Sequence, residues 1–174
     1  MEDKIFITHD EQNNVTGAFG FEPEVPFITV PSSIWQQFAI YKKEDIVIEA
    51  GQLTVSTDAL LVTQKAKKVR ELETAFQVAS KLPVTVGKNT YNGGEDSAGK
   101  LKGALSLASD MSQSIVTFFD INNLPIELSL TDALTVITTI GAKYQSDFAK
   151  FQAYKVSINT STSVEEIQSI VWSN

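Results

Sequence analysis

The stretch from Gly94 to Leu101 has the spacing of a nucleotide-binding loop, with one residue changed. It reads G-E-D-S-A-G-K-L, whereas a phosphate-cradling loop is G-x-x-x-x-G-K followed by serine or threonine. The hydroxyl of that last residue holds magnesium, and Leu101 has no hydroxyl. Glu95 and Asp96 would also stand where a triphosphate has to lie, and would repel it. We therefore interpret the stretch as a turn and the start of a helix, and keep nucleotide binding as a distant alternative.

Other residue types that do chemistry are sparse. The single histidine, His9, falls in a polar stretch and is interpreted as an exposed turn residue. Asp120 begins a stretch that resembles a calcium loop, but Thr131 stands where the bidentate acid is required. Paired acids such as Glu165 and Glu166 fall on predicted helices as solvated or capping charges. The sequence therefore predicts no catalytic residue, no metal ligand and no cofactor, and the protein is expected not to be an enzyme.

Composition narrows the class of protein. The chain has 174 residues, of which 43% are hydrophobic, and no cysteine, so it is expected to bury a core without disulfides. Its net charge of −7 opposes nucleic acid, and its basic residues gather only at 65–70, a solvated helix face or, alternatively, a contact for an acidic partner. The N-terminus is too acidic for a signal peptide, and no apolar run approaches the roughly 20 residues of a membrane span. A cytosolic protein is expected.

Residues 1–58 are predicted to form a small antiparallel β domain. Alternating residues place strands at 4–8 and 15–21, joined as a hairpin, with Val15, Gly17, Phe19 and Phe21 on one face. Prolines on both sides of 27–30 favour an edge strand there. A short helix capped by Ser32 or Ser33 follows, and then a hairpin of 46–49 and 52–56.

The remainder is predicted to be mostly helical, so the fold class is α+β. A connecting helix occupies 59–83, with an apolar stripe of Val62, Val69, Leu72, Phe76 and Ala79. The C-terminal α+β domain, 84–174, has hairpins at 84–91 and 115–130 and a helix at 97–111 that Asp96 or Ser97 caps. A long helix follows from Ser129 or Thr131 to Ile158. Its stripe is expected to include Leu134, Ile137, Gly141, Tyr144, Phe148, Phe151 and Ile158. Thr162 and Glu165 have capping-box spacing before a last short helix.

Several of these segments together resemble a domain of unknown function in tailed-bacteriophage proteins. They are Tyr91 to Ser97 with the small-residue helix after it, Phe118 to Asn123, Leu128 to Leu134, and the closing stretch from Ile158 to Trp172. The resemblance extends from Val84 to Trp172 and departs where phenylalanine stands in the central strand in place of an expected tryptophan. The first half is similar to the N-terminal module of the same proteins through Asn14 to Phe19 and through Val30-Pro31 before Trp35.

This resemblance implies a tail-fibre protein or a tail-fibre assembly protein that works by protein contact. The expected function is a chaperone-like assembly protein in the host cytoplasm, with fibre protein as its partner, self-association as a second kind of contact, and no nucleic acid or membrane partner. The alternative is a permanent virion part, such as a baseplate or fibre adaptor. Candidate partner-binding residues are Phe27, Trp35 and Phe38, for which the alternative role is the core of the small domain.

Overall fold

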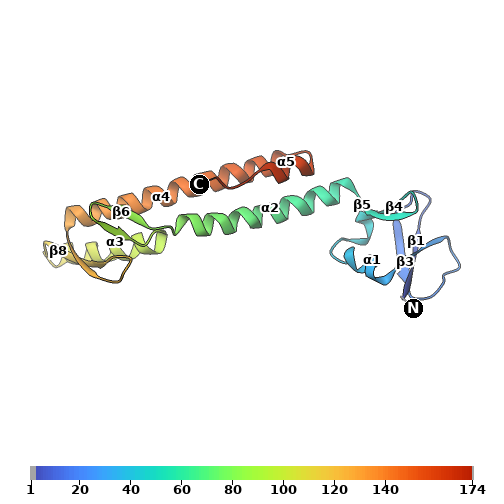
Figure 1. The fold of residues 1–174 in the computed structure, drawn as a ribbon, viewed down its shortest axis with the longest axis horizontal. Coiled ribbons are helices and arrows are strands. Elements are labelled where there is room, and N and C mark those ends of the chain that lie inside the picture. Colours follow the sequence, from blue (N-terminus) through green and yellow to red (C-terminus); the bar gives the residue numbers. More distant parts are fainter. Residues whose placement is uncertain (1–2, 174) are drawn as a thin grey trace. The chain divides into compact units, whose positions relative to one another are not determined.

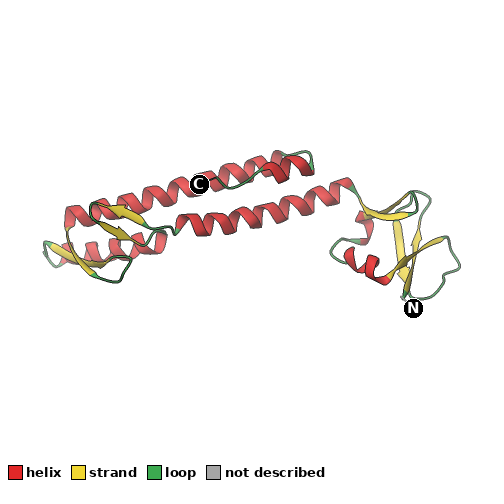
Figure 2. Cartoon of the chain, in the orientation of Figure 1, coloured by secondary structure: helices red, strands yellow, loops and turns green. Residues whose placement is uncertain are grey.

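A computed structural model describes residues 3–173 and confirms the α+β class (Figures 1 and 2). The chain divides into two compact units, residues 1–66 and 67–174. The first holds β1 (Lys4–His9), β2 (Val15–Phe19), β3 (Phe27–Pro31), α1 (Ser32–Gln37), the short 3-10 helix η1 (Lys43–Asp45), β4 (Ile46–Glu49) and β5 (Gln52–Val55). The helix α2 (Thr57–Ser80) begins in the first unit and ends in the second. The second unit continues with β6 (Val84–Val86), β7 (Asn89–Tyr91), α3 (Glu95–Asp110), β8 (Ile115–Phe119), β9 (Pro125–Ser129), α4 (Leu130–Thr160) and α5 (Val164–Ser169).

The first unit is built on a three-stranded antiparallel sheet with β1 in the middle and β2 and β3 at the edges. The predicted edge position of β3 is therefore confirmed. One face of this sheet packs with the β4–β5 hairpin around a core of Ile7, Val15, Val30, Ile46 and Ile48. The β4–β5 turn uses Ala50 and Gly51, both at positive φ, the conformation that a two-residue hairpin turn matching strand twist requires.

A β-bulge changes which residues of β2 share a face. Thr8 pairs with Gly17, whereas His9 pairs with Val15, so Thr16 is an extra residue in the strand. Val15 consequently turns into the core and is buried, while Gly17 stays on the opposite face. The prediction that these two residues share one face is wrong, because alternation counted along the sequence does not register an inserted residue.

The start of α1 also differs from the prediction. The helix begins at Ser32, and Pro31 is its N-cap residue, without a side-chain hydrogen bond. The prediction that Ser32 or Ser33 caps the helix is therefore wrong. Proline fits at this end because it has no backbone N–H group that needs a partner, and because its φ is fixed, here at −58°.

The second unit has two core clusters. The larger one joins both hairpins, α3 and the first half of α4; its buried residues are Val84, Tyr91, Leu101, Ala108, Val116, Leu128, Ala133, Val136 and Ile140. The smaller one packs the end of α2 on the second half of α4, through Leu72, Phe76, Phe151 and Ile158. The α3 and α4 helices lie side by side in Figure 1. Both clusters leave one flank of α4 in solvent.

The predicted stripe of α4 is wrong in phase in the first half of the helix and is confirmed in the second half, where Phe151 and Ile158 are buried. Leu134 is 53% exposed, whereas Ala133, Val136 and Ile140 are buried, so the buried stripe in the first half of α4 lies beside the predicted one. On α2 the predicted stripe is confirmed at Leu72, Phe76 and Ala79, which are buried, whereas Val62 is 67% exposed. In the first half of α4 the small residue Ala133 occupies a packed position, because α3 packs against α4.

The C-terminal segment after α5 returns along α4 (Figure 1). The Trp172 ring lies 5.7 Å from that of Tyr154 and 6.4 Å from that of Phe76, and the Lys150 ammonium stands over it at 5.2 Å. Ser163 caps α5 by accepting from the Glu166 N–H at 3.1 Å. The predicted capping box at Thr162 and Glu165 is therefore displaced by one residue.

Two hairpin turns have the same hydrogen-bond pattern. Asp10 and Asp120 each accept, through Oδ1, the N–H groups of the residues two and four positions further on, at 2.8–2.9 Å. In each turn the fourth residue, Asn13 or Asn123, has a positive φ near 60°, which asparagine tolerates. The two aspartates thus fix the β1–β2 and β8–β9 turns, and Asp120 is used structurally.

Candidate functional site

The glycine-rich turn between β7 and α3 is shaped by backbone contacts. A Cβ atom on Gly93 would lie 2.1 Å from the Leu82 carbonyl oxygen, so a larger residue does not fit. Gly94 is the N-cap of α3 at a φ of 91°, without a side-chain cap. The prediction that Asp96 or Ser97 caps this helix is wrong, because α3 starts earlier, at Glu95.

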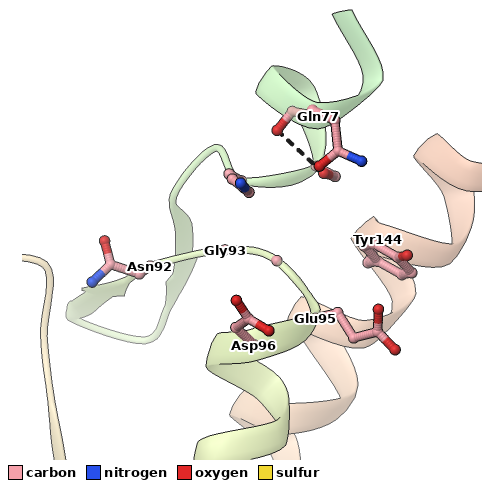
Figure 3. A pocket seen from close by; sticks show the side chains of 9 residues that line it. Gln77, Asn92, Gly93, Glu95, Asp96 and Tyr144 are labelled. Carbon is pink, nitrogen blue, oxygen red and sulfur yellow. Dashed lines mark hydrogen bonds between the residues drawn. The ribbon is translucent and has the colours of Figure 1, made fainter. Parts of the chain in front are cut away.

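A pocket of about 400 Å³ opens beside this turn (Figure 3). Its lining includes Glu95, Asp96 and Lys81, so two carboxylates face the space that a phosphate group would need. Lys100, the lysine of the loop-like sequence, is exposed and does not line the pocket, and Leu101 is fully buried in the core. The residues of the phosphate-loop pattern are therefore not brought together around one ligand-sized space.

Tyr144 closes the α4 side of this pocket next to Glu95 (Figure 3). Burial, and then the charge of Glu95 and a hydrogen bond to it, raise the pKa of the Tyr144 hydroxyl above 10.0. The ring packs on Phe76 and Phe148 at 5.7 and 6.3 Å. With its ring in an aromatic cluster and its hydroxyl protonated at neutral pH, Tyr144 acts as a hydrogen-bond donor to Glu95.

The other residues considered for catalysis or metal binding do not form a site. His9 is the last residue of β1 and half-buried, and its Nδ1 lies 3.0 Å from the Asp10 carbonyl oxygen; the exposed-turn interpretation is wrong. Within residues 3–173, no three histidine, cysteine, aspartate or glutamate side chains gather as a metal site. In the same residues, no helix has the length and apolarity to cross a membrane.

The sheet of the first unit carries a second face, away from the core, that is aromatic. Cross-strand partners share a face, and the pairs Phe6–Phe19 and Thr8–Phe27 place three phenylalanines together. The Phe6 and Phe27 rings meet edge to face at 5.3 Å. All three phenylalanines are only half-buried and lie outside the core cluster. We call Phe6, Phe19 and Phe27 the aromatic face.

The connection after β2 enlarges this apolar surface. Phe21 places its ring 5.5 Å from that of Phe19 and remains 68% exposed. Gly17 lies under the Phe19 ring, because a Cβ there would come within 2.5 Å of Phe19 Cε2. A bare glycine thus lets the Phe19 ring lie flat along the sheet.

The three predicted partner-binding residues fall on two sides of the sheet. Phe27 belongs to the aromatic face, whereas Trp35 and Phe38 are half-buried against the core cluster on the other side. The sequence analysis missed Phe6 and Phe19 as members of a surface. Alternation in β1, where Phe6 separates Ile5 from Ile7, is the signal that could have placed Phe6 on the face opposite the core.

Residues 63–171 match DUF4376, a domain of unknown function. No curated protein and no solved structure matches the chain. The matched residues cover more than half of the chain, including all of α3, both hairpins of the second unit, and α4. The chain therefore belongs to the DUF4376 family.

Proposed function

We propose that this chain is a non-enzymatic assembly protein for bacteriophage tail fibres, and that it binds fibre protein through the aromatic face. The observation that carries the proposal is the grouping of the half-buried Phe6, Phe19 and Phe27, with the 68% exposed Phe21 beside them, on a sheet whose other face already supplies the core. A contiguous aromatic surface on a small unit is typical of a protein-binding site. The resemblance of Val84 to Trp172 to tail-fibre and fibre-assembly proteins supplies the class of partner.

The edge strand β3 adds main-chain chemistry to this surface. It pairs only with β1 among the described strands, so its outer side is open to an extended segment of a partner. A hollow of about 270 Å³ lined by Lys4, Thr29, Val30 and Pro31 lies at this strand. An added strand could place an apolar side chain there while its neighbours contact Phe27.

The physical role follows from the state of an unassembled fibre. Fibre subunits are β-rich, and their unpaired edges and apolar surfaces aggregate until assembly is complete. A small partner that covers such a segment in the host cytoplasm would keep it available for assembly. Phe27 would make the contact, whereas Trp35 and Phe38 would hold the sheet from behind.

The test is co-expression of the fibre protein with this chain and with a Phe6→Ser/Phe27→Ser variant. We expect the variant to lower the yield of soluble fibre trimer, since truncating a central aromatic contact costs about 2 kcal/mol or more. Val62→Ser removes an exposed apolar side chain from α2 and is the matched control. Trp35 fluorescence verifies that the first unit remains folded. Equal fibre yields with wild type, variant and no added chain would refute the proposal.

The second candidate is a permanent tail component, such as a baseplate or fibre adaptor. The resemblance favours it to the extent that the same domain occurs within fibre proteins themselves. Mass spectrometry of purified particles separates the two proposals. An assembly protein that departs is absent from particles, whereas an adaptor is present in a fixed ratio to the fibre.

A further inference from the structure

The β8–β9 ribbon of the second unit has an apolar face in solvent. Val116 and Phe118 point to the core, so Ile115, Thr117 and Phe119 form the opposite face. Ile115 is 48% exposed and Phe119 is 53% exposed. The outer face of an antiparallel ribbon is ordinarily polar, so two large apolar side chains on one five-residue strand need another explanation.

The tip of the same ribbon continues this apolar surface. The Asp120 turn exposes Ile121 and Leu124. The Asp10 turn, with the same hydrogen bonds, carries Glu11 and Asn14 in the equivalent places. The turn geometry therefore does not require apolar residues at these positions.

The strand β8 also has an open edge. In the described part of the chain it pairs only with β9, so the N–H and C=O groups on its outer side have no strand partner. β8 contains no proline and no charged residue, the residue types that most often block pairing at an open edge. An open edge and an exposed apolar face on one strand both suit an added β-strand.

The sequence of β8 is self-complementary about its central residue. If a second copy pairs antiparallel with Thr117 opposite Thr117, Ile115 faces Phe119 of the other copy on the outer face. Val116 then faces Phe118 on the inner face. Pairs of an aromatic and a β-branched residue, and Thr–Thr pairs, are among the stabilising cross-strand combinations. A two-fold axis requires this reciprocity: Ile115 of each copy contacts Phe119 of the other.

Charge permits the same pairing. β8 carries no charged residue, and the one charge on the ribbon's outer face is Glu127 on β9, opposite Thr117. In a paired ribbon the two Glu127 positions would be three strand spacings apart, about 14 Å. That separation exceeds the Debye length of about 8 Å at physiological ionic strength, so their repulsion is largely screened.

We propose that two copies of this chain associate through β8, forming a four-stranded antiparallel sheet in the order β9-β8-β8-β9. The association lies in the second unit and does not depend on the identity of the fibre partner or on the aromatic face. Ile115 and Phe119 supply the apolar contact, and the main chain of β8 supplies the hydrogen bonds.

The test is sedimentation of the full chain over a broad concentration range, with charge variants at the two-fold position. Wild type is expected to reach twice the 19.1 kDa of one chain. Thr117→Lys and Thr117→Glu would each place like charges about 5 Å apart and weaken the dimer at least about tenfold. Mixing these two variants should restore dimers, because lysine then faces glutamate. Ala18→Lys, on the edge strand β2, is the matched control and should dimerise like wild type.

Each outcome decides the proposal. A wild type that stays at the mass of one chain would overturn it, as would a Thr117→Lys variant that dimerises as tightly as wild type. Failure of the lysine and glutamate variants to combine, when both retain the Trp172 fluorescence of the folded second unit, would also overturn it. Soluble fibre yield is a separate readout, so loss of the assembly function would leave this result unaffected.

Discussion

The Lys143 ammonium donates a hydrogen bond to the Ala79 carbonyl oxygen at 2.6 Å and so ties the middle of α4 to the last turn of α2. The same ammonium pairs with Asp147 at 2.7 Å, one turn further along α4. The last carbonyl groups of a helix lack intrahelical partners, and a cation there also meets the negative end of the helix dipole. The Ala79 carbonyl oxygen also accepts from the Leu82 N–H at 3.1 Å, so the Lys143 side chain adds a second hydrogen bond at this helix end and holds α4 against α2.

Replacing Lys143 with methionine is predicted to destabilise the second unit. Methionine keeps the aliphatic length but removes the donor and leaves Asp147 half-buried without its cation, a loss of about 1–3 kcal/mol. Urea unfolding monitored by Trp172 in a Trp35→Phe background reports on this unit alone. Lys102→Met changes an exposed lysine on α3 and should stay within about 0.5 kcal/mol of the parent. Equal midpoints for both variants would contradict the prediction.

Two glycine positions predict opposite effects of alanine. Gly93→Ala sets a Cβ against the Leu82 carbonyl oxygen, and since backbone must move, we expect a loss of more than about 2 kcal/mol. Gly99 lies within α3 with open space around its Cα. Gly99→Ala should therefore gain about 0.5–1 kcal/mol from helix propensity. Thermal unfolding followed by circular dichroism measures both, and a stabilised Gly93→Ala would refute the close contact.

The Asp10 carboxylate is predicted to stabilise the folded protein, and this contribution is predicted to be lost at acid pH. Hydrogen bonds from Asn14, through its side chain and then its backbone, hold the pKa of Asp10 below the ordinary 3.8. Because the folded-state pKa is the lower one, the carboxylate stabilises the fold above pH 3.8, and this contribution disappears as the pH falls through the folded-state value. Asp10→Asn keeps a hydrogen-bond acceptor without the charge. Trp35 fluorescence in a Trp172→Phe background, followed from about pH 5 to about pH 2.5, should show a weaker acid dependence in the variant.

Tyr144 predicts the opposite pH dependence. Its raised pKa means that the protonated hydroxyl is favoured in the folded state, so its contribution is complete below pH 10.0 and lost as the pH rises through the folded-state value. Tyr144→Phe should therefore lose less stability than wild type between neutral pH and about pH 11. Urea midpoints at both pH values, read from Trp172, measure the difference. Identical alkaline losses would show that the hydroxyl is not held by burial and Glu95.

The sequence predicted element types well, because strong local patterns produced them. The alternation in β1, the β6–β7 hairpin and the 3–4 spacing over α2 and α4 all depend on neighbours in sequence. The face of α4 that is buried was predicted less well in the first half of that helix. Ala133 is buried and Leu134 is exposed because α3 approaches closely there, and no local pattern reports that approach.

The aromatic face shows the same limit for the candidate site. Phe27 was predicted as a contact residue from its type, but its grouping with Phe6 and Phe19 requires the register of three strands. The bulge at Thr16 separates Val15 from that face, and an inserted residue leaves no mark in hydrophobic spacing. The choice between surface and core for Trp35 and Phe38 likewise depended on knowing which side of the sheet the β4–β5 hairpin covers.

The matched turns at Asp10 and Asp120 separate what builds a hairpin end from what it displays. The aspartate and the asparagine three places later hold the conformation, and the side chain directly after the aspartate, Glu11 or Ile121, takes no part in the hydrogen bonds of the turn. One hairpin end displays an acid at this position and the other an aliphatic group. Exchanging Glu11 and Ile121 would move apolar surface from one hairpin to the other while leaving the hydrogen bonds of both turns in place.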